Sequence, residues 1–169
     1  MVASEPLAVL RADGGTNVGL GHLTRSLALG EALVALGWRV LLASKSAPEA
    51  IRSMVSRAEI GTHDIKATVG SAADASELAS LHPDLIIVDG YQFSVDFYTQ
   101  LEQSRLRHAV LDDNVETTAL NPTFVINQNP HAKPLMYARF KHSQLLLGLQ
   151  YAMIREQVRL AHSAPINRA

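Results

Sequence analysis

The chain has 169 residues, 47% hydrophobic and 18% charged, which is enough apolar material for one globular domain with its own core. Its 15 basic and 16 acidic residues leave a formal net charge of -1, so neither a nucleic acid nor an anionic membrane is expected as a partner. The absence of cysteine excludes disulfides and thiolate chemistry. No apolar stretch approaches the ~20 residues that span a bilayer, and the first residues lack signal-peptide features, so we expect a cytoplasmic location.

Strand-like and helix-like segments alternate from the start of the chain. Residues 7–12 form a short apolar run, and a helix is predicted from near Thr24 until Gly37 stops it. Residues 38–43 are apolar again, which completes one β-α-β unit. The next helix is expected to begin at Ser46-Ala-Pro48, where proline suits the first turn, and to turn three apolar side chains inward, namely Ile51, Met54 and Val55.

The second half of the sequence continues the alternation. Residues 59–69 give a weaker signal that indicates a short strand. A helix over 72–81, a buried strand over 84–89 and a helix capped by Ser94 are predicted next, the last carrying Val95, Tyr98 and Leu101. The remaining segments are strands over 109–112 and 124–127, a polar stretch through 141, and an apolar run over 145–149.

This alternation predicts an α/β fold with a doubly wound, mostly parallel sheet, in which ligands bind at the carboxyl edge of the strands. Polar residues follow strand after strand at that edge: Asp13, Asp89 with Tyr91, Asp112 with Asp113, and Asn127 with Asn129. One aspartate after a strand is commonly a turn or helix cap. Several together favour a ligand site.

The loop Gly19-Leu-Gly-His22-Leu-Thr-Arg25 follows the first predicted strand. Neither Gly19 nor Gly21 has a Cβ, so the backbone can turn tightly and approach a bound group. The free N–H groups of the next helix favour an oxygen-rich ligand, and an imidazole can exchange a proton near neutral pH. We therefore interpret the loop as part of a catalytic site. The alternative is that His22 is a solvent-exposed residue at the start of a helix.

The same residues argue against some ligands. Thr24 stands where the third glycine of a dinucleotide fingerprint would fall, which disfavours a nicotinamide cofactor. The aspartates would repel a diphosphate, with only Arg11 and Arg25 near them in sequence, so a neutral, hydroxyl-rich or amide-rich group fits better. The other histidines show no paired ligand spacing, and we predict no metal and no cofactor.

Six motifs together resemble a known family, the nucleotide-sugar hydrolases of pseudaminic acid biosynthesis (PseG family) with the related spore-coat polysaccharide proteins. They occur in collinear order over nearly the whole chain: Arg11-Ala-Asp13, Val18-Gly-Leu-Gly-His22-Leu-Thr-Arg25, Val88-Asp-Gly-Tyr91, Leu111-Asp-Asp113, Ile126-Asn-Gln-Asn129 and Gly148-Leu-Gln-Tyr151-Ala-Met-Ile-Arg155-Glu156.

The resemblance implies the Rossmann-like amino-terminal half of a glycosyltransferase-B (GT-B) architecture. It implies hydrolysis of UDP-2,4-diacetamido-2,4,6-trideoxy-β-L-altropyranose to UDP and free sugar, without a metal. His22 would be the general base that activates water, with Gly19 and Gly21 shaping the loop. The substrate-binding residues would be Asp13, Arg25, Asp89, Tyr91, Asp112, Asp113, Asn127 and Asn129.

The resemblance also sets the expected domain organisation. Residues 1–157 would form the catalytic domain and 158–169 the start of a linker or tail, with Tyr151 and Arg155 docking the linker rather than touching substrate. The nucleotide-binding domain expected from the family is not in this sequence, so it would be supplied by a longer protein or a partner chain. An exposed interdomain face could then drive self-association.

Three functions stay open on the sequence alone. The first is the hydrolase, and the second is a GT-B glycosyltransferase in which His22 would deprotonate an acceptor hydroxyl. The third is a non-catalytic domain that binds a sugar or a partner. In that case Tyr91 would only pack, and Asn127-Gln-Asn129 would be a polar turn after a strand.

Overall fold

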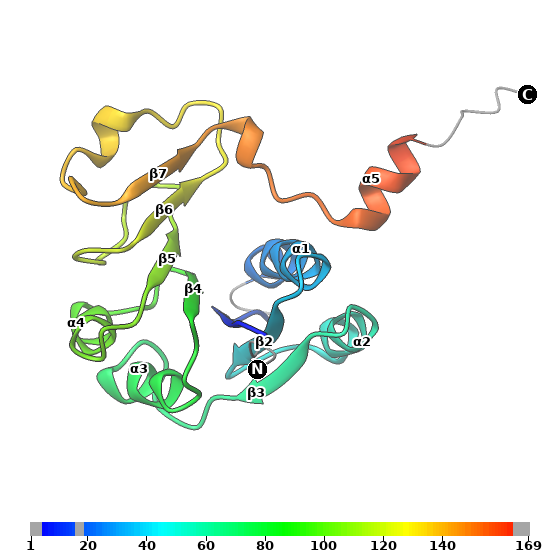
Figure 1. Cartoon of the computed structure of the whole chain (residues 1–169), viewed down its shortest axis with the longest axis horizontal. Helices are drawn as coiled ribbons and strands as arrows, with labels where there is room; N and C mark the ends of the chain where they lie inside the picture. The colour runs from blue at the N-terminus through cyan, green and yellow to red at the C-terminus, as the bar shows by residue number, and fades with distance from the viewer. Residues whose placement is uncertain (1–4, 16–18, 164–169) are drawn as a thin grey trace, which may run out of the picture.

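The computed structural model describes residues 5–15 and 19–163, so Val18 of the glycine-loop motif and the end of the predicted tail, 164–169, lie outside the described residues. Seven strands form one sheet in the order β3-β2-β1-β4-β5-β6-β7, and all neighbours pair in parallel (Figure 1). The strands are β1 (Leu7–Ala12), β2 (Arg39–Ser44), β3 (Gly61–Asp64), β4 (Leu85–Asp89), β5 (His108–Leu111), β6 (Phe124–Asn127) and β7 (Gln144–Leu147). The predicted doubly wound parallel sheet is confirmed, and its order reverses between β1 and β4, where such sheets bind ligands.

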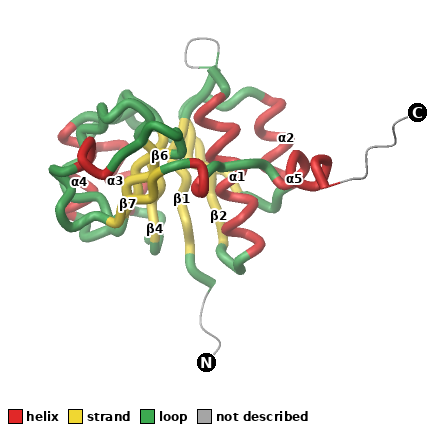
Figure 2. Tube along the Cα trace, turned by 90° about the horizontal axis from the view of Figure 1, so that it is seen from above, coloured by secondary structure: helices red, strands yellow, loops and turns green. Residues whose placement is uncertain are grey.

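Helices cover both faces of this sheet. One face carries α1 (Gly21–Ala35) and α2 (Glu49–Arg57), and the other carries α3 (Ala72–Ala79) and α4 (Val95–Gln103), as Figures 1 and 2 show. Short 3-10 turns η1 (Pro134–Tyr137) and η2 (Leu149–Tyr151) flank β7. The chain then crosses to the side of α1 and ends in α5 (Glu156–Ser163), a helix that the sequence analysis does not predict.

The alternation of side chains along the strands builds two cores. In β1, Leu7 and Val9 pack with the α3 and α4 side, whereas Ala8, Leu10 and Ala12 pack with the α1 and α2 side. Successive residues of a strand point to opposite faces, so a strand buried on both faces is apolar throughout. Each fully buried leucine of this kind stabilises the fold by ~1.5–3 kcal/mol.

The element ends show where sequence patterns are weak. Helix α1 begins at Gly21 rather than near Thr24, because Leu20 takes the N-cap position without a side-chain cap that could signal it. It ends at Ala35, and Gly37 stops it as predicted: this glycine has φ 82°, and its N–H bonds to the carbonyl of Val34. In α4, Val95 is exposed although it was expected on the apolar face, since it is the first residue of the helix.

The weak signal over 59–69 corresponds to β3, an edge strand. Its four residues alternate between partly buried and exposed, because it lies at the edge of the sheet and pairs with one strand, β2. The apolar run over 145–149 divides between β7 and η2. Along α2, Ile51 and Val55 are buried as predicted, and Met54 packs partly buried against the same core.

A buried arginine organises the end of β1. Arg11 is fully buried, and its guanidinium bonds to Asp13 at 2.7 Å and to Asp74 of α3 at 2.9 Å, with the ring of Phe93 5.2 Å away. Burial by itself would raise the pKa of Asp13, but Arg11 and the backbone N–H groups of Ser46 and Lys45 lower it overall. The three ionised groups therefore form one closed unit.

Gly70 ties this unit to the loop after β4. Its N–H donates to Asp74 Oδ2 at 2.9 Å, and its carbonyl accepts from the N–H and hydroxyl of Ser94. It lies at φ 71°, and a Cβ added there would stand 2.0 Å from the carbonyl oxygen of Gln92. Only glycine fits this contact.

We expect Arg11→Met to lower the free energy of unfolding by ~3–5 kcal/mol, because it leaves two buried carboxylates without their cation. Arg52→Met is the matched control, since Arg52 pairs with Asp64 at an exposed position and should cost at most ~1 kcal/mol. Urea denaturation of both variants measures the difference. Equal losses would contradict a structural role for the buried arginine.

His108 gives a prediction that depends on pH. It is buried, its Nε2 has no hydrogen-bond partner within the described part of the chain, and burial lowers its pKa below the ordinary 6.5. The unfolded chain therefore binds a proton at higher pH than the folded chain, and stability falls as pH drops below about 6.5. His108→Leu should match the parent at pH 8 and exceed it at pH 5, as measured by thermal unfolding. A parent and variant with the same pH dependence would contradict this.

Candidate active site

Asp89, the last residue of β4, lies at the centre of the polar residues at the carboxyl edge. Its carboxylate is buried, and Oδ1 bonds to His22 Nδ1 at 2.7 Å and to the guanidinium of Arg25. Its Oδ2 accepts from Arg25 Nε at 2.6 Å and from Ser26 Oγ at 3.4 Å. All three partners come from the first two turns of α1, so this carboxylate fixes the start of α1 against the end of β4.

The pairing with Asp89 sets the tautomer of His22. An ionised carboxylate only accepts hydrogen bonds, so the contact with Asp89 needs a proton on Nδ1, and in the neutral imidazole the lone pair is then on Nε2; Arg25 Nη2 lies 3.2 Å from the same Nδ1. Nε2 makes no hydrogen bond to any described residue. The side chain is 16% exposed and lines a cleft of about 390 Å³. His22 is therefore oriented as an acceptor of protons from a molecule in that cleft.

Arg25 links this pair to the next two strands. It bonds to Asp113 in the loop after β5, and Asp113 in turn accepts from Asn129 Nδ2 at 3.2 Å in the loop after β6. Burial alone would lower the pKa of Arg25, but the bonds to Asp89 and Asp113 raise it, so the guanidinium stays charged. One cation between two carboxylates makes this edge less acidic than the sequence indicates.

Tyr91 lies on the solvent side of His22. The two rings meet edge to face, with centroids 5.5 Å apart, and Tyr91 is 46% exposed. Burial of the phenol and the negative charge of Asp113 raise its pKa, so it is a neutral hydrogen-bond donor at physiological pH. An exposed tyrosine beside an imidazole can donate a hydrogen bond to a molecule bound next to His22.

Three of the predicted binding residues instead use their side chains inside the protein. Asp13 bonds to Arg11, Ser44 and two backbone N–H groups. Asp112 accepts from the N–H groups of Glu116 and Thr117, and Asn127 bonds to Tyr137 and Asn129. All three are buried, and they shape the loops that carry the exposed residues.

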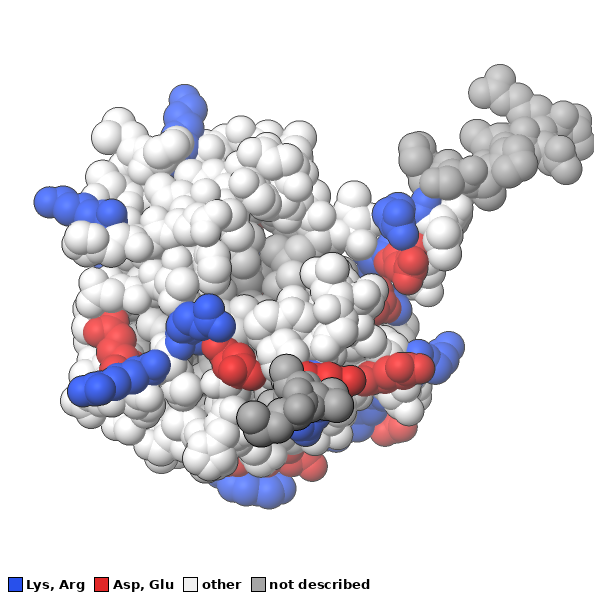
Figure 3. Space-filling model, viewed as in Figure 1, with Lys and Arg blue, Asp and Glu red and all other residues white. Residues whose placement is uncertain are grey.

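The structure thus gathers His22, Arg25, Asp89, Tyr91, Asp113 and Asn129 at one place. Gly21 opens α1 beside them, and Gly19 turns at φ 77° and pairs with Gly15 through two backbone hydrogen bonds. Among the described residues, no group of three or more histidine or acidic side chains could hold a metal ion. On the face in Figure 3, charges of both signs are interspersed.

Four residues that line the cleft are not among the predicted site residues, namely Leu20, Thr24, Gln128 and Met153. Gln128 and Met153 line the same cleft as His22. Gln128 could have been found, because it lies between the two predicted asparagines 127 and 129. Met153 could not, because it is an apolar residue in the segment after β7, and nothing in the sequence indicates that this segment crosses to α1.

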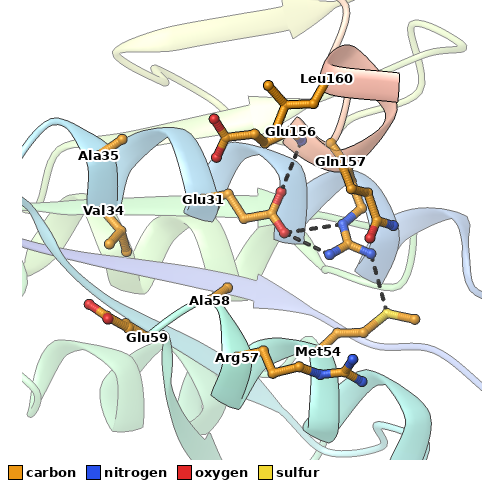
Figure 4. Close-up of a pocket in the computed structure, with 11 residues that line it drawn as sticks. Glu31, Val34, Ala35, Met54, Arg57, Ala58, Glu59, Glu156, Gln157 and Leu160 are labelled. Carbon is orange, nitrogen blue, oxygen red and sulfur yellow. Dashed lines mark hydrogen bonds and ion pairs between the residues drawn. The ribbon is translucent and has the colours of Figure 1, made fainter. Parts of the chain in front are cut away.

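Another cavity, of about 490 Å³, lies elsewhere, between α1, α2 and α5 (Figure 4). There Arg155 bonds to Glu31 of α1 at 2.7 Å and so joins the segment after β7 to α1; that Arg155 docks an interdomain linker stays a prediction. Tyr151, at the end of η2, is 37% exposed. Large apolar side chains are also exposed on and before α5, including Ile154, Val158 and Leu160; self-association through such a face stays a prediction.

Comparisons with known proteins reveal the fold but not a family. No family model and no curated protein matches the chain. A solved glycosyltransferase from Rickettsia africae ESF-5 matches with a TM-score of 0.59 and 8% identity, over 97% of this chain and 51% of that one. The chain thus spans about half of that protein. The likeness is one of fold, and that fold is the Rossmann-like α/β fold with a parallel sheet.

Two further solved structures match less well. TcCGT1 in complex with UDP gives a TM-score of 0.45 and 23% identity over 64% of this chain and 28% of that one. The glycotransferase of kitacinnamycin gives a TM-score of 0.41 and 18% identity over 63% of this chain and 30% of that one. The parallel sheet and the match to the Rickettsia africae structure confirm the expected α/β fold, whereas hydrolase activity and the roles of the site residues stay predictions. No helix of the described chain is long and apolar enough to cross a membrane, and a cytoplasmic location also stays a prediction.

We expect Asp112→Asn to lower the free energy of unfolding by ~1–2 kcal/mol, since one buried N–H group loses its acceptor. Asp96→Asn, at an exposed position in α4, should change it by less than ~0.5 kcal/mol. Chemical denaturation measures both, and binding of a UDP-sugar is measured in parallel. If Asp112 touches substrate, its variant will instead lose affinity while its stability is unchanged.

Proposed function

We propose that this chain is the sugar-binding, catalytic domain of an enzyme that hydrolyses a UDP-linked diacetamido-trideoxy hexose to UDP and free sugar. One observation carries the proposal: His22 is held by Asp89 through Nδ1, and its Nε2 is left without a partner among the described residues. The motif resemblance and the GT-B fold support the substrate class.

In the proposed reaction, His22 Nε2 removes a proton from a water molecule as the water oxygen attacks the anomeric carbon. The bond between that carbon and the β-phosphate oxygen breaks, and its electron pair leaves with UDP. The imidazolium that forms is stabilised by the Asp89 carboxylate 2.7 Å from Nδ1. Proton transfer by such a positioned base is typically worth ~10²–10⁴ in rate.

The neighbouring residues have supporting roles in this proposal. Arg25 holds Asp89 and Asp113 in place, Tyr91 donates a hydrogen bond to the sugar, and Asn129, whose Nδ2 donates to Asp113, accepts one at Oδ1. The described residues at this edge pair their charges among themselves. We therefore assign the diphosphate to a separate nucleotide-binding domain, in a longer protein or a partner chain, with residues 1–157 as the catalytic domain.

A second candidate is a GT-B glycosyltransferase, favoured by the similarity of fold to the Rickettsia africae glycosyltransferase. The same base would then remove the proton of an acceptor hydroxyl instead of water. The two reactions differ in only one reactant, so the arrangement of His22 and Asp89 serves both.

The test is release of UDP from the diacetamido nucleotide sugar without an acceptor. We expect His22→Gln to reduce the rate by about 10²–10⁴, since glutamine cannot act as a base. Asp89→Asn should lower it by about 10² or more, because it no longer orients the Nδ1 proton. The exposed His142→Gln, distant in sequence from the site, is the control and should retain the parent rate.

The outcomes separate the three functions. Release of UDP by the parent chain without an acceptor supports the hydrolase. Release of UDP only after addition of an acceptor sugar supports the glycosyltransferase. Binding of the nucleotide sugar with no release under either condition, and no effect of His22→Gln, would favour the non-catalytic domain and contradict the proposal.

A further inference from the structure

The cleft beside His22 has a second wall, to whose residues the family resemblance assigns no role. One wall is the start of α1, with Leu20 and His22, and the other is formed by Gln128 after β6 and Met153 after η2. The two walls come from opposite ends of the described chain.

Gln128 is oriented by the backbone of its neighbour in the cleft. The N–H of Met153 donates to Gln128 Oε1 at 3.0 Å. Because a backbone N–H can only donate, the carboxamide oxygen must face Met153, and the Nε2 end points away from it. Nε2 has no hydrogen-bond partner within the ranges that the structure describes. Two donor hydrogens are therefore free for a ligand.

Residues 148–155 form a strap, which we define as the segment from the end of β7 to the start of α5. It is fixed at three points. The N–H of Gly148 donates to the carbonyl of Asn127 at 2.9 Å, Met153 bonds to Gln128, and Arg155 bonds to Glu31 of α1 (Figure 4). The side chains of Arg155 and Glu31 are 14% and 16% exposed, so this pair is shielded from solvent. The strap is thus fixed to α1, the helix whose first turn carries His22.

The chemistry of the cleft is neutral. Its charged member is Arg25, whose guanidinium is already bonded to Asp89 and Asp113. The remaining lining combines the apolar side chains of Leu20 and Met153 with Gly21 and the polar residues His22, Thr24 and Gln128. Such a surface suits the ring and uncharged substituents of a sugar better than a diphosphate.

We propose that this cleft is a subsite for the sugar ring, that the strap is one of its walls, and that Gln128 Nε2 donates a hydrogen bond to a sugar oxygen. Glu31 and Arg155 are positioning residues that hold the strap. The proposal rests on the proposed function for the identity of the substrate, but its test reads binding and not turnover.

The absence of cysteine makes the test direct. Met153→Cys introduces a single thiol in the strap, and its rate of labelling by a maleimide is followed by mass spectrometry. At a concentration of the UDP-diacetamido sugar roughly ten times Kd, labelling should slow about tenfold, since only the unbound fraction reacts. UDP alone should not slow it. Leu135→Cys, at a position that is 85% exposed in η1, should be labelled equally fast with and without the sugar.

Matched variants in the Met153→Cys background test how the strap is held. Gln128→Glu keeps an oxygen for the backbone N–H of position 153, so the introduced thiol should react slowly without ligand. Because it removes the Nε2 donor, the sugar should protect the thiol less. Gln128→Leu and Arg155→Met remove one fastening each and should speed labelling several-fold without ligand. Gln144→Glu controls for the added charge, because Gln144 is exposed at the start of β7, whereas Gln128 follows the end of β6. It should change the labelling rate neither without nor with the sugar.

The results separate this proposal from the proposed function. Equal protection by UDP and by the nucleotide sugar, or no protection by either, would overturn the sugar subsite even if UDP is released. A Gln128→Glu chain that reacts as fast as Gln128→Leu would overturn the role of the Oε1 bond. Protection of the strap thiol by the sugar, in a chain that never releases UDP, would support the subsite and overturn only the hydrolase.

Discussion

The candidate site depends on one buried carboxylate, Asp89. A charge removed from water is costly unless it is paired and hydrogen-bonded, and Asp89 obtains its partners almost entirely from α1. The electrostatic requirement of one residue on β4 therefore determines where the first turn of α1 must lie. Because His22 is one of those partners, the same requirement aims its imidazole. Stability and chemical competence are coupled here, since any loosening of α1 exposes the carboxylate and misdirects the base.

Two arginines play comparable parts at this edge of the sheet. Arg11 joins Asp13, after β1, to Asp74 of α3. Arg25 joins Asp89, at the end of β4, to Asp113, after β5. Each guanidinium offers a planar set of donors that can bond two carboxylates at once. The first cluster is sealed and supports the loops, whereas the second is partly open and borders the cleft. The difference in burial divides the polar residues at this edge into a supporting layer and an exposed layer.

Much of this arrangement could be predicted from the sequence, because alternation of apolar runs determines a parallel sheet, and a parallel sheet brings all of its carboxyl ends together. The gathering of His22, Asp89, Tyr91 and Asp113 followed from that geometry alone. What could not be predicted was which polar side chains remain available to a ligand. Asp112 and Asp113 are adjacent and chemically identical, yet one caps a turn and the other pairs with Arg25. That distinction depends on how the backbone of the loop after β5 turns. The pairing of Asp74 with Arg11 and the path of the strap likewise depend on how the backbone folds.

Gly70 limits how this protein can vary. Its carbonyl, its N–H and the space where a side chain would stand are all occupied by other parts of the chain. A substitution there has no local remedy, since the obstruction is the backbone of Gln92 and the strain is in Gly70's own dihedral angle. Libraries of random variants selected only for folding should therefore be depleted of every other residue at this position. Directed evolution toward new substrates would have to change the exposed loops while this crossing point stays fixed.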